Sequence, residues 1–292
     1  MQPSNPQILR QDQFLAELDS FDCIIDVRSP AEFALDHIPG AVNYPVLDNE
    51  ERAQIGTLYK QDSPFAAKKL GAALVSRNIA NHLEKHFQDF PRTWRPLVYC
   101  WRGGERSGAF THILNRIGWK AMQLEGGYQG FRRTVIDGLE QAAEQFSFRV
   151  ICGMTGSGKT RVLQEARHYG AQILDLEALA IHRGSVLGNE PNIEQPSQKG
   201  FETALWNALR ALDPSRPVLV ESESKKVGGL HVPDALMEKI RSGACIELRS
   251  SPQTRVSWLI REYHHFLTDT DNFKAKLALL TAHYGKVQIA KW

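Results

Sequence analysis

The chain has 292 residues and a formal net charge of +2 at pH 7. Hydrophobic residues make up 42% and charged residues 23%, which is typical of a globular protein and excludes a disordered or fibrous chain. A chain of this length is expected to form two domains of about 150 residues. Its nearly neutral charge excludes attraction of nucleic acid by the whole molecule, so such a partner has to meet a local basic surface.

No run of about 18 apolar residues is present, so we expect no membrane-spanning helix and no membrane partner. The first residues lack the basic start and apolar block of a secretory signal. The four cysteines are scattered without a Cys-x-x-Cys pair: Cys23, Cys100, Cys152 and Cys245. Their spacing argues against a disulfide framework or a zinc site, and it favours a reducing cytoplasm in which a lone thiol can act. We therefore expect a cytoplasmic protein.

In the first half, short apolar strands alternate with helices. The expected strands are residues 23–28 and 97–99, residues 37–43 are expected to form a turn that leads into a further strand, and the expected helices are residues 31–35 and 107–117. Ser29 followed by proline is a start signal for the first helix, and Gly118 ends the second. This alternation predicts a parallel sheet whose loops at the strand ends bind ligands.

The loop after the third strand carries the candidate catalytic residues. Cys100 is followed by Arg102, Gly103, Gly104 and Arg106. A strand–loop–helix turn of this kind points backbone N–H groups inward and adds the positive end of the helix. This field favours the thiolate of Cys100 and a bound tetrahedral oxyanion. The alternative is a buried structural cysteine, but two glycines and two arginines favour the reactive thiol.

A mostly helical insertion is expected over residues 49–80, between the early strands. It either buttresses the sheet or presents basic residues to a polyanion; these are Arg52, Lys60, Lys68, Lys69 and Arg77. A polar helical stretch over residues 134–146 has no obvious core role, so the domain boundary is placed near Gln145.

Residues 148–152 predict a strand that leads into the sequence GMTGSGKT, which fulfils the P-loop pattern GxxxxGK[ST] at every position. The backbone of the loop is expected to enclose a phosphate through Gly153, Thr155, Gly156, Ser157 and Gly158. Lys159 reaches the distal phosphates, and the Thr160 hydroxyl can ligate Mg²⁺. A chance match is the alternative, but the strand before the loop and the helix expected over residues 161–169 are the context that a P-loop requires.

A second strand of this half, residues 218–220, is followed by two acidic residues. If the strand continues, Glu221 and Glu223 point to opposite faces, so at most one of them is expected to reach Mg²⁺. We favour Glu221.

The segment 173–177 ends another strand and leads to a polar turn. Asp175 is either a substrate or metal contact or a helix N-cap. His182 and Arg183 either bind phosphate or are ordinary surface residues.

Several segments of the first half match the signature of a rhodanese homology domain: residues 26–33, 37–41, 100–107 and 124–128. Five residues separate Cys100 from Arg106, one more than in sulfurtransferases with the shorter loop. This longer loop resembles that of the cell-cycle dual-specificity phosphatases, and it suits a bulkier anion than thiosulfate chemistry requires.

The joined pattern resembles the tRNA 2-selenouridine synthase family. The residues that carry this resemblance are 26–41, 59–61, 100–107, 126–128, 153–160, 175–188 and 221–224. It implies an α/β fold with a rhodanese-like parallel-sheet domain over residues 1–145, a P-loop NTPase-like domain over 146–252 and a helical C-terminal segment over 253–292. The family continues for a further helical region beyond the position that corresponds to residue 292.

Enzymes of that family replace the sulfur of 2-thiouridine at the wobble position of certain tRNAs with selenium, through an S-geranylated uridine. The resemblance therefore implies selenophosphate and geranyl diphosphate as co-substrates and the anticodon region of tRNA as partner, and the P-loop residues lead us to expect Mg²⁺ as cofactor. An enzyme that supplies selenophosphate is a further expected partner. On this hypothesis the P-loop holds the diphosphate, and the Cys100 loop either holds selenophosphate or accepts selenium as a perselenide.

Two rival interpretations remain open on the sequence. The first is a cysteine-dependent phosphatase fused to an NTP-dependent kinase, although Glu105 inside the loop would repel a dianion unless it faces out. The second is an inactive scaffold that binds RNA and nucleotide. The C-terminal segment interleaves basic and aromatic residues, and these either contact RNA or pack the helices.

Overall fold

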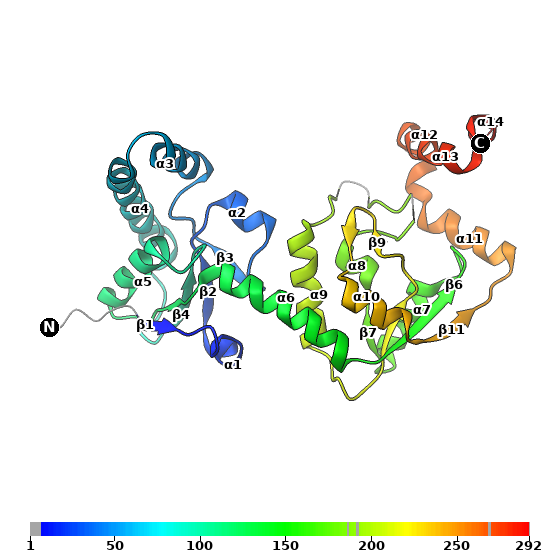
Figure 1. The fold of residues 1–292 in the computed structure, drawn as a ribbon, viewed down its shortest axis with the longest axis horizontal. Coiled ribbons are helices and arrows are strands. Elements are labelled where there is room, and N and C mark those ends of the chain that lie inside the picture. The colour runs from blue at the N-terminus through cyan, green and yellow to red at the C-terminus, as the bar shows by residue number, and fades with distance from the viewer. Residues whose placement is uncertain (1–6, 186, 191–192, 268–269, 292) are drawn as a thin grey trace. The chain divides into compact units, whose positions relative to one another are not determined.

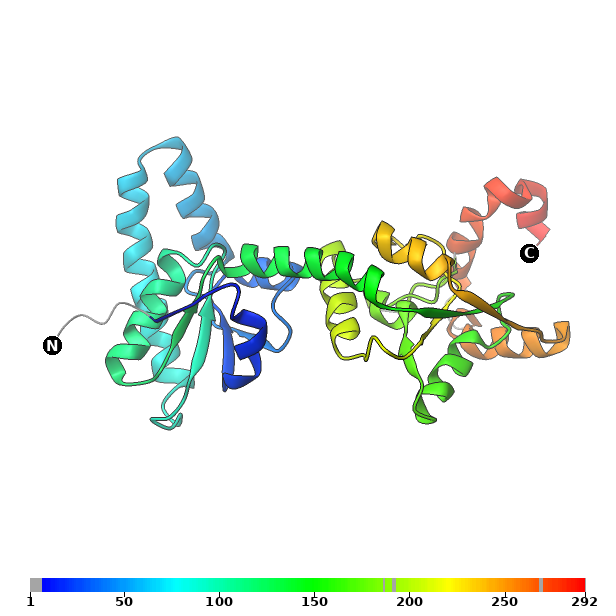
Figure 2. The same ribbon diagram turned by 60° about the horizontal axis from the view of Figure 1, so that its bottom comes forward.

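The computed structural model describes residues 7–185, 187–190, 193–267 and 270–291. It divides into two compact units, Met1–Val135 and Ile136–Trp292 (Figure 1). Each unit contains a parallel sheet with helices packed on it (Figure 2), which confirms the α/β fold expected from the sequence. In the described part of the chain, none of the helices combines the length and apolarity needed to cross a bilayer.

The first unit has a five-stranded parallel sheet in the order β1-β5-β4-β2-β3. Its strands are β1 (Gln7–Leu9), β2 (Cys23–Asp26), β3 (Ala41–Asn43), β4 (Pro96–Tyr99) and β5 (Met122–Leu124). Its helices are α1 (Phe14–Glu17), the 3-10 helix Leu18–Ser20, α2 (Pro30–Leu35), α3 (Asn49–Gln61), α4 (Pro64–His86), α5 (Glu105–Ile117) and the first part of α6 (Gly127–Gln145).

Local sequence signals explain the helix ends in this unit. Ser29 and Glu32 form a capping box at the start of α2, with Pro30 in the first turn. Gly118 adopts the left-handed conformation that ends α5. Between sheet and helices lies a buried apolar core that includes Ile25, Val27, Val98, Ile79, Phe87, Phe110 and Leu114. Truncation of a core aromatic such as Phe110 to alanine is expected to cost about 3–5 kcal/mol.

The insertion expected over residues 49–80 consists of α3 and α4, which pack against each other, and α4 continues to His86. Asp48 and Glu51 form a capping box before α3, and the Ser63 hydroxyl caps α4. Leu74, Val75 and Ile79 of α4 are part of the buried core, so this helix does buttress the sheet.

The second unit has a four-stranded parallel sheet in the order β11-β6-β8-β7. Its strands are β6 (Phe148–Gly153), β7 (Gln172–Leu174), β8 (Val218–Glu221), β11 (Ala244–Leu248) and the antiparallel pair β9 (Lys226–Val227) and β10 (Leu230–His231). Its helices after α6 are α7 (Lys159–His168), α8 (Leu176–Ala180), α9 (Gln198–Arg210), α10 (Asp234–Arg241), α11 (Pro252–Glu262), the 3-10 helix His264–Leu267, α12 (Thr270–Leu279), α13 (Thr281–Tyr284) and α14 (Lys286–Lys291).

The C-terminal part of α6 has a packing role, contrary to the expectation from its polar sequence. Leu139, Ala142 and Ala143 are buried. At Gly138 the helix comes so close to α9 that a Cβ atom would lie 2.5 Å from the indole nitrogen of Trp206. The sequence did not predict this packing because the close contact between the helices is made by small residues, which contribute little to a hydrophobic pattern.

Two of the four cysteines are paired, which corrects the expectation that none would be. Cys152 of β6 and Cys245 of β11 form a disulfide whose Cα atoms are 6.1 Å apart, within the range usual for such bonds. Strands β6 and β11 are hydrogen-bonded neighbours. The 93 residues between the two cysteines conceal this proximity in the sequence. Cys23 and Cys100 are free.

Candidate active sites

The first candidate site is the loop between β6 and α7. Gly156 and Gly158 have φ angles of +78° and +86°, which L side chains rarely adopt and which let the loop turn tightly. The loop borders a cavity of about 850 Å³, which is also lined by Asp175, Glu221 and Arg183. The structure therefore has the strand, glycine-rich loop and helix of a phosphate-binding P-loop.

Side chains hold this loop in shape from both sides. The Lys159 ammonium donates to the carbonyl of Gly153 at 3.2 Å, across the loop. From α11, the Arg255 guanidinium donates to the carbonyl of Thr155 at 3.0 Å. The Ser250 hydroxyl, which precedes α11, donates to the carbonyl of Ser157 at 3.2 Å. Within the loop, the Ser157 N–H also donates to the carbonyl of Met154 at 3.0 Å, so the loop is closed by its own backbone as well as by these side chains.

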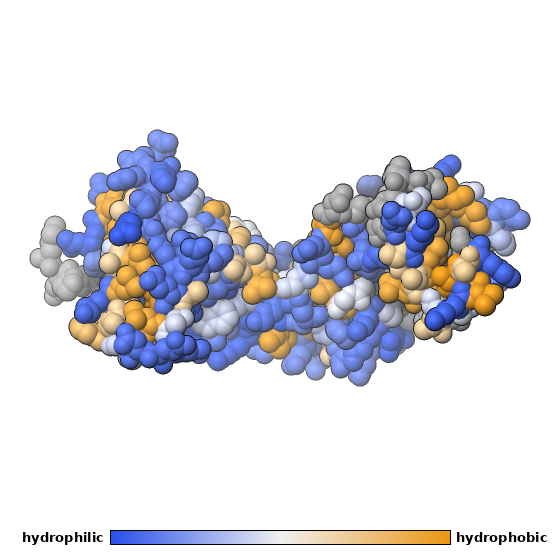
Figure 3. All heavy atoms as spheres, turned by 90° about the horizontal axis from the view of Figure 1, so that it is seen from above, coloured by the Kyte–Doolittle hydropathy of each residue, from blue (hydrophilic) through white to orange (hydrophobic). Residues whose placement is uncertain are grey.

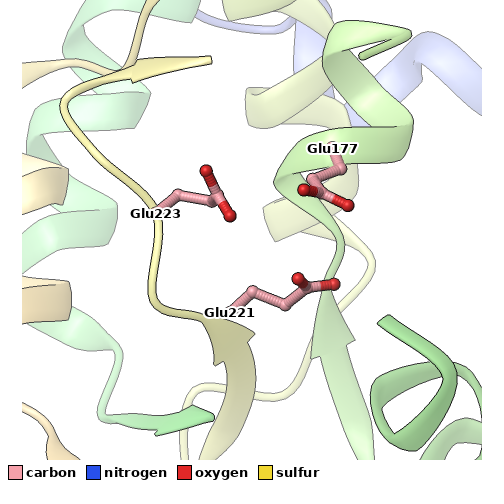
Figure 4. A group of neighbouring side chains, drawn as sticks. All are labelled: Glu177, Glu221 and Glu223. Carbon is pink, nitrogen blue, oxygen red and sulfur yellow. The ribbon is translucent and has the colours of Figure 1, made fainter. Parts of the chain in front are cut away.

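Three carboxylates meet beside the loop, as Figure 4 shows. Glu221 is the last residue of β8, Glu223 lies in the segment that follows, and Glu177 is in the first turn of α8. One oxygen from each lies within 4.8 Å of the others. The expectation that Glu221 and Glu223 point to opposite faces was wrong, because β8 ends at Glu221 and the alternation of sides ends with it.

Glu177 is a site residue that the sequence analysis missed. We expected residues 173–177 to end a strand, whereas β7 stops at Leu174 and α8 begins at Leu176. The turn of this short helix brings Glu177 over the P-loop, where its carboxylate accepts a hydrogen bond from the Thr160 hydroxyl at 3.2 Å. The sequence signal that could have indicated Glu177 is its position, two residues after the candidate Asp175.

The three carboxylates repel one another in a partly dry environment. Burial raises the pKa of Glu177 to about 8, with further contributions from Glu221 and Glu223. Burial likewise raises the pKa of Glu221 to about 7, and it raises the pKa of Glu223 although Lys159 opposes the rise. One buried oxygen of Glu221 has no hydrogen-bond partner within the described residues. Clustered carboxylate oxygens with an unpartnered lone pair fit a hard divalent cation such as Mg²⁺.

The polar residues predicted on either side of α8 take different positions. Asp175 caps α8 by accepting from the Ala178 N–H at 2.9 Å, as the N-cap alternative predicted, and it also lines the cavity. Arg183 forms an ion pair with Glu190 at 2.7 Å. His182 is buried, so it is not an ordinary surface residue, and its Nδ1 accepts from the Gly184 N–H at 3.1 Å.

The second candidate site is the loop between β4 and α5. The Cys100 sulfur is buried and accepts hydrogen bonds from the Gly104 N–H at 3.3 Å and the Ser107 hydroxyl at 3.1 Å. The Gln123 amide donates to the Ser107 hydroxyl at 2.9 Å and to the carbonyls of Gly103 and Gly104 at 2.6 and 3.1 Å. Two donors are thus directed at one sulfur, which fixes its position in the loop. Ser107 and Gln123 are functional candidates that the sequence analysis did not select.

The charged residues of this loop point in different directions. Arg106 forms an ion pair with Glu32 of α2 at 2.9 Å. Burial opposes ionisation of Glu32, but Arg106 holds the pKa of this carboxyl below its usual value. Arg102 is exposed and donates to Gln129 at 3.0 Å, and Glu105 is exposed at the start of α5. The outward position of Glu105 removes the repulsion that it would otherwise exert on an anion in the loop.

Two family models match the chain. One, described as a rhodanese-like domain, matches residues 10–134, and the other, described as a tRNA 2-selenouridine synthase AAA domain, matches residues 146–282. A tRNA 2-selenouridine synthase of Nitrosomonas eutropha is 38% identical over 264 residues, which cover 89% of this chain and 67% of that protein. The chain belongs to the tRNA 2-selenouridine synthase family. The resemblance found in the sequence is thereby confirmed.

The family member of Nitrosomonas europaea is also 38% identical, over 244 residues that cover 82% of this chain and 63% of that protein. The chain thus spans about two thirds of the length of these curated relatives. Among solved structures, the N-terminal domain of a putative ATP/GTP binding protein from Clostridium difficile 630 is 30% identical, with a TM-score of 0.38. That match covers 44% of this chain and 99% of the other.

Proposed function

We propose that the chain is a tRNA-modifying transferase that replaces the sulfur of 2-thiouridine by selenium, through an S-geranylated intermediate. The main support is the P-loop with three convergent carboxylates, which suits a diphosphate–Mg²⁺ leaving group. The Cys100 loop in the same chain supplies a separate thiol site. The names of the 38% identical relatives support the formation of 2-selenouridine in tRNA, and the geranylated intermediate is part of the proposal.

In the first step, the P-loop would hold the diphosphate of geranyl diphosphate. The thiouridine sulfur forms a bond to C1 of the geranyl group, the C1–O bond breaks, the diphosphate leaves with the electron pair, and N3 of the base loses its proton. Lys159 and the loop N–H groups meet the charge on the departing diphosphate. Glu177, Glu221, Glu223 and the Thr160 hydroxyl would hold Mg²⁺, which supplies further neutralisation of that charge.

In the second step, the Cys100 loop would act on selenophosphate. Selenium has the same oxidation state in selenophosphate and in selenouridine, so a Cys100 perselenide would require an oxidant or the departure of phosphorus as phosphite. Attack of the Cys100 sulfur on phosphorus balances without either. The S–P bond forms, the P–Se bond breaks, and hydrogen selenide leaves with the electron pair. Water then releases phosphate from Cys100, and the selenide displaces geranyl thiolate from C2 of the base.

The helical hairpin α3–α4 offers the described surface that best fits RNA. Tyr59 and Phe65, near its turn, are 56% and 69% exposed, and the Lys69 ammonium lies 5.0 Å from the centre of the Phe65 ring. Lys60 and Lys68 are exposed nearby. Exposed rings beside cations suit stacked bases and phosphates. Hydrophilic surface is widespread on the face of the molecule in Figure 3.

In the C-terminal segment, Phe266 and Leu277 are buried, which favours helix packing there.

The test is nucleoside mass spectrometry on an anticodon stem-loop that contains 2-thiouridine. Wild type, Cys100→Ser and Lys159→Ala receive geranyl diphosphate, selenophosphate, both or neither. We expect geranylated nucleoside with the diphosphate alone, lost in Lys159→Ala, and selenouridine with both, lost in Cys100→Ser. If no nucleoside changes mass while aryl phosphates or ATP are hydrolysed, the phosphatase–kinase interpretation replaces this proposal.

A further inference from the structure

A second cavity, of about 470 Å³, lies directly beside the P-loop. Its wall includes Ser157 and Gly158 of the loop, Arg161, Val162 and Ala166 of α7, and Trp258 of α11. A cavity of this size is within the range of small-molecule sites. Nothing in the diphosphate chemistry described above uses it.

The second cavity adjoins the phosphate site at the start of α7. Gly158 and Arg161 line both cavities. A Cβ atom at Gly158 would meet no atom within 4 Å, so the space over this residue is open. A molecule whose diphosphate lies in the loop can therefore extend past Gly158 into the second cavity.

Helix α11 fixes the far wall against the loop. Leu259 packs so closely on Gly156 that a Cβ atom there would lie 2.9 Å from the leucine Cγ. The adjacent residue, Trp258, presents its ring to the cavity, with the Arg161 guanidinium 4.5 Å and the Arg261 guanidinium 5.4 Å from the ring centre. The aromatic wall is thus positioned by the same helix that holds the P-loop carbonyls.

The wall of the second cavity is largely hydrocarbon. The Trp258 ring, the Val162 and Ala166 side chains and the stem of Arg161 supply carbon surface, and Val162 is 41% exposed without a covering group. Of the two charged residues in the wall, Arg161 already has its guanidinium over Trp258, and Glu165 is exposed. A nucleotide base can stack on the Trp258 ring, but selective recognition of a base also needs directed hydrogen-bond partners, whereas an aliphatic chain needs only the apolar contact that this wall provides.

We infer that this cavity holds the hydrocarbon chain of the prenyl diphosphate, with Trp258 as its main contact. This inference rests on the proposed function, because the donor named there joins an apolar chain to a diphosphate. It assigns the specificity for a prenyl group to α7 and α11, and the recognition of the diphosphate to the loop.

The test is calorimetric binding to the full chain with Mg²⁺, using geranyl diphosphate, inorganic pyrophosphate and ADP. For Trp258→Ala we expect binding of geranyl diphosphate to weaken by about tenfold or more, while pyrophosphate binding changes by less than about twofold. Trp258→Phe should retain the preference for geranyl diphosphate. Val162→Glu, at an exposed position that folding tolerates, should lose it. Tyr169→Ala, at an 89% exposed aromatic outside the cavity wall, is the matched control and should behave as wild type.

Two results would overturn the assignment while the proposed function stands. One is a wild type that prefers geranyl diphosphate to pyrophosphate and a Trp258→Ala variant that keeps this preference. The other is a Trp258→Ala variant that loses ADP or pyrophosphate as strongly as geranyl diphosphate, which would make the residue a base contact or a support of the loop. A wild type that binds geranyl diphosphate no more tightly than pyrophosphate would overturn the prenyl donor itself, and the assignment with it.

Discussion

The Thr160 hydroxyl donates a hydrogen bond to the Glu177 carboxylate at 3.2 Å. Thr160 is the last residue of the P-loop motif and lies in the first turn of α7, so this contact joins the motif to the first turn of α8. Glu221 and Glu223 approach Glu177 from the end of β8. The candidate cation site is thus assembled from three segments, and each fixes the position of the others.

Glu177→Gln should weaken the response to Mg²⁺ without abolishing the fold. The amide keeps the size of the side chain and can still accept from Thr160, but it removes one negative charge from the cluster. We expect the Kd for Mg²⁺, measured by calorimetry, to rise by about tenfold or more because the site loses one negative charge. Glu165→Gln on α7, which removes an exposed carboxylate outside the cluster, should leave the Mg²⁺ titration unchanged. Equal titrations for both variants would contradict the assignment of Glu177.

Without a divalent cation, stability should fall as the pH rises. The pKa of Glu177 is raised to about 8 and that of Glu221 to about 7, from ordinary values of 4.5. The folded state therefore binds more protons than the unfolded state, and the resulting stabilisation is complete below 4.5 and is lost as the pH passes through 7 and 8. We expect the Tm in EDTA to decrease as the pH rises from 4.5 to about 8, and we expect Mg²⁺ to restore the Tm at about pH 8. A Tm in EDTA that does not change over this interval would contradict the packing of the three carboxylates.

Gly184→Ala should disrupt the carboxylate cluster, because the added methyl group would collide with the Glu223 side chain. Gly184 has a φ of +64°, and a Cβ atom there would lie 2.7 Å from an oxygen of Glu223. Gly170→Ala is the matched control, because its φ of +82° imposes the same backbone strain while its Cβ would meet nothing within 4 Å. We expect the free energy of unfolding, measured in urea, to fall by about 1–2 kcal/mol in both variants. Only Gly184→Ala should also lose Mg²⁺ binding by calorimetry, and an equal loss in Gly170→Ala would assign the effect to strain alone.

The sequence was sufficient for the parts of this molecule whose signals are local. The P-loop spacing, the capping residue Ser29 and the C-cap Gly118 each specify structure within a few positions, and the structure has the elements that they predict. The loop after β4 was found in the same way, because its glycines and arginines are contiguous.

Contacts set by strand order could not be predicted from the sequence. Glu177 lies 44 positions before Glu221, and only the adjacency of β7 and β8 brings these residues together. The cysteines of β6 and β11 are a further example, since one-dimensional spacing gave no sign of their pairing. The sequence also did not predict where β8 ends. Its last residue is a buried glutamate, and glutamate is seldom found in a dry interior.

Ser107→Ala should slow the reaction of Cys100 with iodoacetamide at pH 7. Ser107 is fully buried and donates one of the two hydrogen bonds to the Cys100 sulfur, so its removal takes away one of the two donors that hold the reactive sulfur in the loop. A hydrogen bond worth about 0.5–1.5 kcal/mol corresponds to a rate reduction of about 2- to 12-fold. Peptide mass spectrometry measures this rate separately from that of Cys23, which is free and serves as the internal reference. An unchanged ratio of the two rates would show that the loop N–H of Gly104 alone holds the sulfur for reaction, and a faster reaction of Cys100 would show that Ser107 acts mainly by closing the loop over the sulfur.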